Sequence, residues 1–135
     1  MDVLYQAHVQ NQGWQSQVQN GVTAGTTGQS LRVEAVKISL RGVSGTRILY
    51  RAHIQDVGWS GWSADGEQSG TTGQGRRIEA IEIKLEGAPD NLGVVYQAHV
   101  ANRGWLEWQN DGSTAGTTGS SLQLEAFKVV LAYTR

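Results

Sequence analysis

Apolar and polar residues alternate along residues 3–9, the first patterned stretch of the chain. Apolar side chains take every second position from Val3 to Val9, and the residues between them, His8 included, are polar except for Leu4. A period of two predicts a β-strand with one buried and one exposed face. The same alternation returns around Tyr50 and again around Tyr96, so we expect three equivalent strands.

Each of these strands begins a unit in which the spacing of turn residues predicts more strands. In the first unit, Gly13 closes a three-residue hairpin loop, and a second strand covers 14–19. Asn20-Gly21 is a strong signal for a tight hairpin turn. A short third strand over 22–24 then runs into the loop Gly25-Thr26-Thr27-Gly28.

The fourth and longest predicted strand, residues 31–40, changes phase in its middle. Its apolar positions alternate as far as Ala35 and then continue from Val36. A slip of one residue would turn half of the strand to the wrong face. A β-bulge at Glu34-Ala35 would restore the alternation and bend the strand. We expect such a bulge in every unit, with the glutamate carboxylate accepting a hydrogen bond from its unpaired backbone N–H.

Three copies of this four-strand unit fill the 135 residues, and steps of 45 and 46 residues separate their first tyrosines. We predict one domain over 1–135, with repeats at 1–44, 45–90 and 91–135. The end copies resemble the middle one and lack the polar caps of a solenoid, so we expect a closed body with pseudo-three-fold symmetry. The fold class is therefore all-β, with a β-prism of three four-stranded sheets as the leading architecture and a β-trefoil as the alternative.

Composition narrows the functional classes. Eighteen glycines and five tryptophans suit short strands and tight turns, and the absence of cysteine excludes disulfides. A net charge of -1 argues against a nucleic-acid partner. No stretch is long and apolar enough for membrane insertion, and the first residues do not read as a signal peptide.

The repeated unit resembles a known family. Its pattern is Tyr-x-Ala-His, Gly-Trp-x-x-Trp, Asp-Gly, Ala-Gly-Thr-Thr-Gly and Leu-Glu-Ala. This is similar to the clostridial hydrophobic repeat with its Trp, the ChW repeat. The resemblance implies a bacterial protein of tandem copies, often secreted or at the cell surface, for which adhesion and glycan binding are the usual proposals. The first copy departs from the pattern, because Gln17 stands where Trp62 and Trp108 stand.

The tryptophans fall into two groups. Trp14, Trp59 and Trp105 follow a turn glycine, and we expect them to plug the body near the three-fold axis. The second group comprises only Trp62 and Trp108, since glutamine replaces it in the first copy. A position that accepts glutamine is not deep core, so these two rings are candidate platforms for the C–H face of a sugar.

The other candidates are polar residues with a structural alternative of their own. Histidines on the outer face of the first strand, turn residues before glycine and the Gly-Thr-Thr-Gly loops could each supply hydrogen bonds to sugar hydroxyls. The candidate carbohydrate-binding residues, besides Trp62 and Trp108, are His8, His53, His99, Asn20, Asp65, Asp111, Gly25, Gly70, Gly116, Thr26, Thr71 and Thr117. Sites two and three are expected to be the competent ones.

These candidates predict a lectin with up to three equivalent shallow sites, binding multivalently to glycan surfaces. The alternative is a non-enzymatic adhesion or structural module that binds protein or cell wall. No nucleophile–base arrangement or metal-binding cluster stands out, so we expect no enzyme, no cofactor and no metal.

Overall fold

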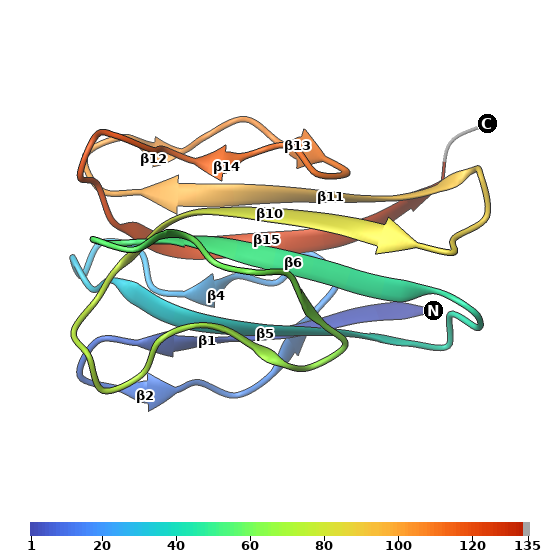
Figure 1. Ribbon diagram of the computed structural model, residues 1–135, viewed down its shortest axis with the longest axis horizontal. Coiled ribbons are helices and arrows are strands. Elements are labelled where there is room, and N and C mark those ends of the chain that lie inside the picture. Colours follow the sequence, from blue (N-terminus) through green and yellow to red (C-terminus); the bar gives the residue numbers. More distant parts are fainter. Residues whose placement is uncertain (134–135) are drawn as a thin grey trace.

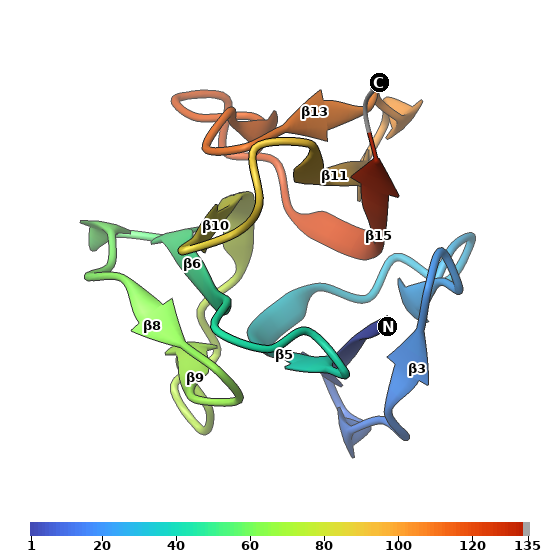
Figure 2. The same ribbon diagram turned by 90° about the vertical axis from the view of Figure 1, so that its right-hand side faces the viewer.

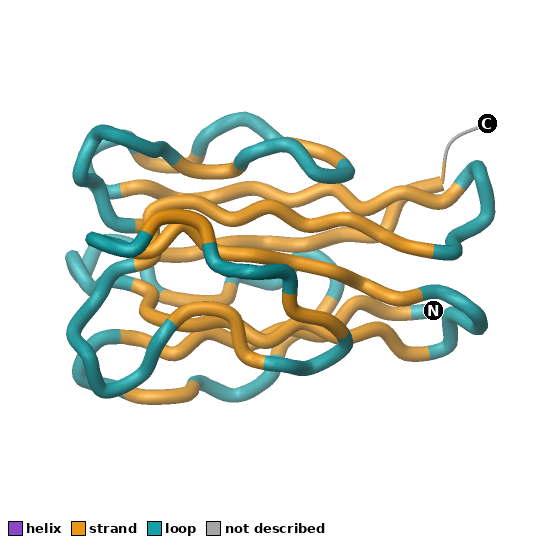
Figure 3. The backbone as a smooth tube through the Cα atoms, viewed as in Figure 1, coloured by secondary structure: helices purple, strands orange, loops and turns teal. Residues whose placement is uncertain are grey.

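The computed structural model describes residues 1–133, and all regular structure in that part of the chain is β-strand (Figures 1 and 3). The first copy contains β1 (Asp2–Val9), β2 (Gly13–Trp14), β3 (Val18–Gln19), β4 (Ala24–Gly25) and β5 (Val33–Arg41). The second contains β6 (Arg47–Ile54), β7 (Gly58–Trp59), β8 (Ser63–Ala64), β9 (Gln68–Gly70) and β10 (Ile78–Glu86). The third contains β11 (Leu92–Val100), β12 (Gly104–Trp105), β13 (Gln109–Asn110), β14 (Ala115–Gly116) and β15 (Leu124–Tyr133). Within residues 1–133 there is no helix that could cross a membrane.

The predicted second strand is two strands. In the first copy, β2 pairs with the end of β1 at His8 and β3 pairs with its start at Leu4. The chain leaves β1 after the Gln15 N–H donates to the Ala7 carbonyl at 2.9 Å and pairs again from Val18. Four strands per copy is therefore wrong, and each sheet has five strands.

Every sheet is shared between two copies. The long antiparallel pair β1 and β5 forms the centre of the first sheet, and β9 from the second copy adds to the free edge of β5. In the same way, β14 of the third copy pairs with β10, and β4 of the first copy pairs with β15. The last pairing joins the third copy to the first, so the predicted ring closure is confirmed (Figure 2).

The predicted bulges are present at the three Glu-Ala pairs. In the first sheet, His8 pairs with Ala35 and Val9 pairs with Val33, which leaves Glu34 without an opposite residue. The second and third sheets shift register at the same place, beside Glu79 and Glu125. The extra residue explains why residues 33–36 are all buried although a regular strand would expose every second one.

The core lies where the three sheets face one another. The strands β5, β10 and β15 approach one another around the axis, where Figure 2 views them end-on. Phe127 stands there where the other copies have Val36 and Ile81, and its ring lies 5.4 Å from that of Tyr5. The buried hydroxyl of each first-strand tyrosine donates to a backbone carbonyl, that of Tyr5 to Val22. Burial raises the pKa of Tyr5 and Tyr50, and raises the pKa of Tyr96 to about 12.

The body has two distinct ends (Figure 1). We call one the loop end; it carries the turns after β1, β6 and β11 and the Gly-Thr-Thr-Gly loops. We call the other the linker end; it carries the connections 42–46 and 87–91 and the N-terminus. The prediction of an all-β, pseudo-three-fold molecule is confirmed, while the choice between β-prism and β-trefoil stays a prediction.

Candidate functional site

The first tryptophan of each copy lies on the outer face of its sheet. Trp14 is half-buried, and its ring meets the His8 ring edge-on with the centroids 5.3 Å apart. His53 with Trp59 and His99 with Trp105 have the same geometry. The expectation that these tryptophans plug the axis is therefore wrong. The outward position of the histidine is set by β1, whose alternation turns His8 outward and Tyr5 inward.

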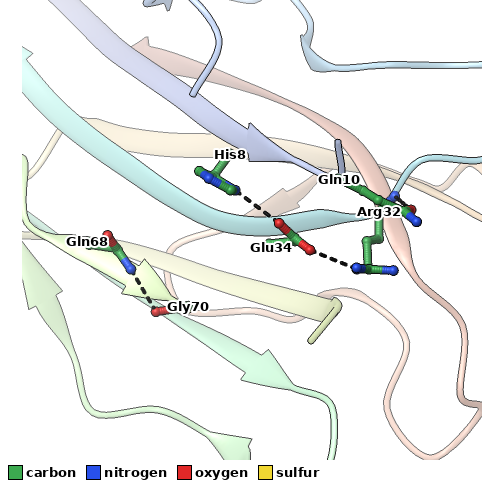
Figure 4. Close-up of polar contacts among 6 residues, drawn as sticks. All are labelled: His8, Gln10, Arg32, Glu34, Gln68 and Gly70. Atoms are coloured by element: carbon green, nitrogen blue, oxygen red, sulfur yellow. Dashed lines mark hydrogen bonds and ion pairs between the residues drawn. The ribbon is translucent and has the colours of Figure 1, made fainter. Parts of the chain in front are cut away.

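Each outward histidine contacts the glutamate of the bulge. In the first copy, Glu34 Oε1 lies 3.0 Å from His8 Nδ1, and Glu34 Oε2 accepts a hydrogen bond from Arg32 Nε at 2.9 Å (Figure 4). Only 8% of the glutamate side chain is exposed, so the two partners stabilise a nearly buried carboxylate. The expected carboxylate contact with the bulge backbone is thus wrong; the bulge instead aims Glu34 at His8.

The second copy repeats this cluster, and the third departs from it. Arg77 occupies the place of Arg32 and contacts Glu79 at 2.9 Å. In the third copy the residue is Gln123, whose amide donates to Glu125 Oε2 at 3.1 Å. His99 Nδ1 is 3.2 Å from Glu125 Oε1, within ion-pair range but without the alignment of a hydrogen bond. Within the described residues 1–133, Glu125 therefore lacks the guanidinium partner that its two counterparts have.

Cations cover some of the tryptophan rings. The Nζ atoms of Lys37 and Lys128 lie 4.4 Å from the ring centroids of Trp14 and Trp105. In the second copy, the Arg51 guanidinium lies 4.8 Å from Trp59 and 4.7 Å from Trp62. Cation–π contacts of this kind hold the rings in place.

The second group of tryptophans is exposed, as predicted. Trp62 is 39% exposed and Trp108 is 47% exposed. Trp62 lies under two cations, because Lys84 Nζ is 4.2 Å from its centroid in addition to Arg51. The residues at the corresponding positions of the third copy are Gln97 and Val130, which carry no charge. Among residues 1–133, no cation lies over the Trp108 ring, so Trp108 is the open aromatic surface.

The turn residues Asn20, Asp65 and Asp111 fasten the start of each sheet. All three have positive φ, and their Oδ1 atoms accept hydrogen bonds at 3.0–3.1 Å from backbone N–H groups at the start of the first strand of each copy. The Asn20 amide also donates to Asp2 at 2.7 Å. This hydrogen bond, with a smaller contribution from Arg41, holds the pKa of Asp2 below its usual value. These side chains therefore have a structural role at the linker end.

Each Gly-Thr-Thr-Gly loop packs on the sheet of a neighbouring copy and not on the sheet of its own copy. Gly25 has φ +95, and a Cβ there would lie 2.3 Å from the Glu125 carbonyl oxygen. The following Thr26 N–H donates to the same oxygen at 3.0 Å. Gly70 and Gly116 meet the bulges at Glu34 and Glu79 in the same way. The first glycine of each loop thus forms the seam between two copies. The Thr26, Thr71 and Thr117 hydroxyls are buried there and have no hydrogen-bond partner in the part of the chain that the structure describes.

The predicted site residues therefore do not lie together within each copy. Each histidine lies with the loop of a different copy: His8 with the loop at Gly70, His53 with that at Gly116, and His99 with that at Gly25. The Asp-Gly turns pair near the start of the long first strands, at the opposite end from the histidines. Trp62 and Trp108 lie on the outer faces between these two ends. A binding role for any of these residues stays a prediction.

A pocket opens at the seam between the third and first copies. It has a volume of about 470 Å³ and lies at the loop end. Its lining includes Gly28 and Ser30 from the first copy and His99, Arg103, Gln123 and Glu125 from the third. Of the last four, Arg103 donates hydrogen bonds, Glu125 accepts them, and His99 and Gln123 can do both. Sequence reasoning did not find Arg103 or Gln123; the signal available was that Gln123 replaces Arg32 and Arg77.

All three copies match one protein family. Residues 8–42, 53–87 and 99–132 each match the family described as Clostridial hydrophobic W. These segments cover most of the chain, and the protein belongs to this family as three tandem copies. Comparison with curated proteins gave no match, and comparison with solved structures gave none either.

Proposed function

We propose that the protein is a non-enzymatic carbohydrate-binding protein whose principal contact is the open aromatic face of Trp108. The single observation that supports this is the pair of exposed tryptophans, Trp62 and Trp108, on a body whose core uses neither. A ligand that covers these rings would remove their apolar surface from water, which favours binding. An aromatic face that keeps polar neighbours suits a sugar, which has one apolar face and a rim of hydroxyls.

The contrast between the copies sharpens the expectation of three equivalent sites. The first copy has Gln17, which offers no ring. The second has Trp62, whose ring is already in contact with Arg51 and Lys84. The third has Trp108, with Gln97 and Val130 at the positions that Arg51 and Lys84 occupy in the second copy. Binding should therefore be strongest at the third copy, weaker at the second and absent at this position in the first.

A glycan array followed by calorimetry with the best ligand tests the proposal. Trp108→Ala should weaken binding roughly fivefold, because a lost stacking contact costs about 1 kcal/mol and 1.4 kcal/mol is tenfold. Trp62→Ala should have a smaller effect. Val22→Ala is the matched control: Val22 is 51% exposed, lies in a turn of the first copy, and should leave affinity unchanged.

The adhesion or structural alternative makes the opposite prediction. It expects capture of a protein or intact cell wall and no signal with soluble glycans. If the protein is folded by circular dichroism and no glycan on the array gives a signal above background, carbohydrate binding is rejected.

A further inference from the structure

We infer that the pocket at the seam between the third and first copies is a second binding site, specific for a single neutral sugar residue. This inference rests on the proposed carbohydrate-binding function and adds a site distinct from Trp108, which does not line the pocket. Its volume of about 470 Å³ falls within the range of small-molecule sites.

One substitution distinguishes the seam of the third copy from the other two. Arg32 and Arg77 lie against the bulge glutamate in the first two copies, with Nε 2.9 Å from the carboxylate. Gln123 is shorter and does not reach as far into the seam. The seam of the third copy is therefore the one in which a ligand can take the space that the guanidinium occupies elsewhere.

Glu125 has hydrogen-bonding capacity that its neighbours leave unmet. Its side chain is 8% exposed, and its polar contacts are one amide hydrogen bond and an unaligned histidine. A buried carboxylate is stable only when several donors surround it. Glu125 lines the pocket, so a ligand hydroxyl could supply the donor that the replaced arginine no longer gives.

The opposite wall of the pocket carries a positive charge. Arg103 lines the same pocket, where the corresponding residues of the other copies are the uncharged Gln12 and Val57. Among residues 1–133, no carboxylate oxygen lies within 4.0 Å of the Arg103 guanidinium. A donor and an acceptor of opposite charge thus line one cavity without contacting each other. Neighbouring hydroxyls of a neutral sugar can accept from Arg103 and donate to Glu125 at once, whereas an ammonium or a carboxylate would face one like charge.

Solution NMR on the whole protein tests this inference. Methyl hexosides, glucosamine and glucuronate are the probes, and the signals followed are the Gln123 side-chain amide, the Arg103 Nε–H and the Trp108 indole N–H. We expect a saturable shift at Gln123 and Arg103 with at least one methyl hexoside and not with the charged sugars.

Two variants separate a ligand site from general packing. Gln123→Arg restores the residue that the other two seams already accommodate, so it should fold normally and weaken hexoside binding at the pocket at least tenfold. Conversely, the double variant Arg77→Gln and Val57→Arg should create a second such pocket between the second and third copies, where Ser121 already matches Ser30. Two pocket-binding events per chain would then replace one, in addition to binding at Trp108.

The outcomes distinguish this site from Trp108. Shifts at Trp108 alone would overturn the pocket and leave the proposed function standing, and shifts at Gln123 alone would do the reverse for Trp108. Saturation by glucosamine or glucuronate but not by a hexoside would overturn the neutral-sugar assignment. If no probe shifts either site, both proposals are rejected.

Discussion

At the scale of single residues, the first glycine of each Gly-Thr-Thr-Gly loop is in tight contact with the neighbouring copy. A Cβ at Gly70 would lie 2.4 Å from the Glu34 carbonyl oxygen, and its φ of +98 disfavours any side chain. We predict that Gly70→Ala lowers the free energy of unfolding by about 3 kcal/mol, from steric overlap and backbone strain together. Gly73→Ala is the control, because its φ is +74 but nothing lies within 4 Å, and it should cost only about 1 kcal/mol. Equal losses in urea unfolding would contradict the seam contact.

The buried tyrosines determine the response to alkaline pH. Burial raises the pKa of Tyr96 to about 12 from the ordinary value of 10, so the folded state prefers the neutral phenol. The stabilisation is complete below pH 10 and is lost as pH rises through 12, at about 2–3 kcal/mol for Tyr96 alone. We predict that chemical unfolding between pH 9 and 12 shows this loss, and that Tyr96→Phe reduces it. A variant with the same pH profile as the original protein would contradict this.

At the scale of elements, the bulge turns one residue of each long strand into a partner for the outer histidine. Glu79 holds Arg77 at 2.9 Å and His53 at 2.9 Å, whereas Glu125 has no arginine. We predict that Glu79→Gln costs about 2 kcal/mol in urea unfolding, because a charge-assisted pair is lost from a nearly buried position. Glu125→Gln, the matched control, should cost about 1 kcal/mol or less. A larger loss at Glu125 than at Glu79 would contradict the assigned role of Arg77.

The bulge could be predicted from the sequence, whereas the pairing of strands between copies could not. The phase slip at Ala35-Val36 predicted the bulge because alternation is a local property with one simple repair. The pairing of β4 with β15 set which loop meets which histidine, and nothing local to Gly25 indicates that its partner is Ala126. The same reason explains the error at Trp14: a half-buried place on the outer face depends on what β1 and Lys37 present to it.

At the scale of the whole molecule, closure depends on one seam that no connecting segment spans. The seams of β5 with β9 and of β10 with β14 join copies that are consecutive in the chain. The seam of β4 with β15 joins the first copy to the third, and the Tyr133 hydroxyl lies 3.3 Å from Met1 Sδ at the linker end. Each copy therefore pairs one short strand with the long last strand of a neighbour and receives a short strand from the other neighbour on its own last strand. With three copies, all three of these long strands are paired.

This arrangement predicts that the fold tolerates circular permutation but not the loss of a copy. A circular permutant running from Asp90 through a short Gly-Ser linker and on to Pro89 keeps all three seams. It should melt within a few degrees of the original chain by circular dichroism and remain the same size by light scattering. The fragment 1–89 lacks β14 and β15, which leaves the edges of β10 and β4 unpaired. Because exposed edges associate, the fragment should be unfolded or oligomeric. A stable monomeric fragment would show that the seams are not what closes the body.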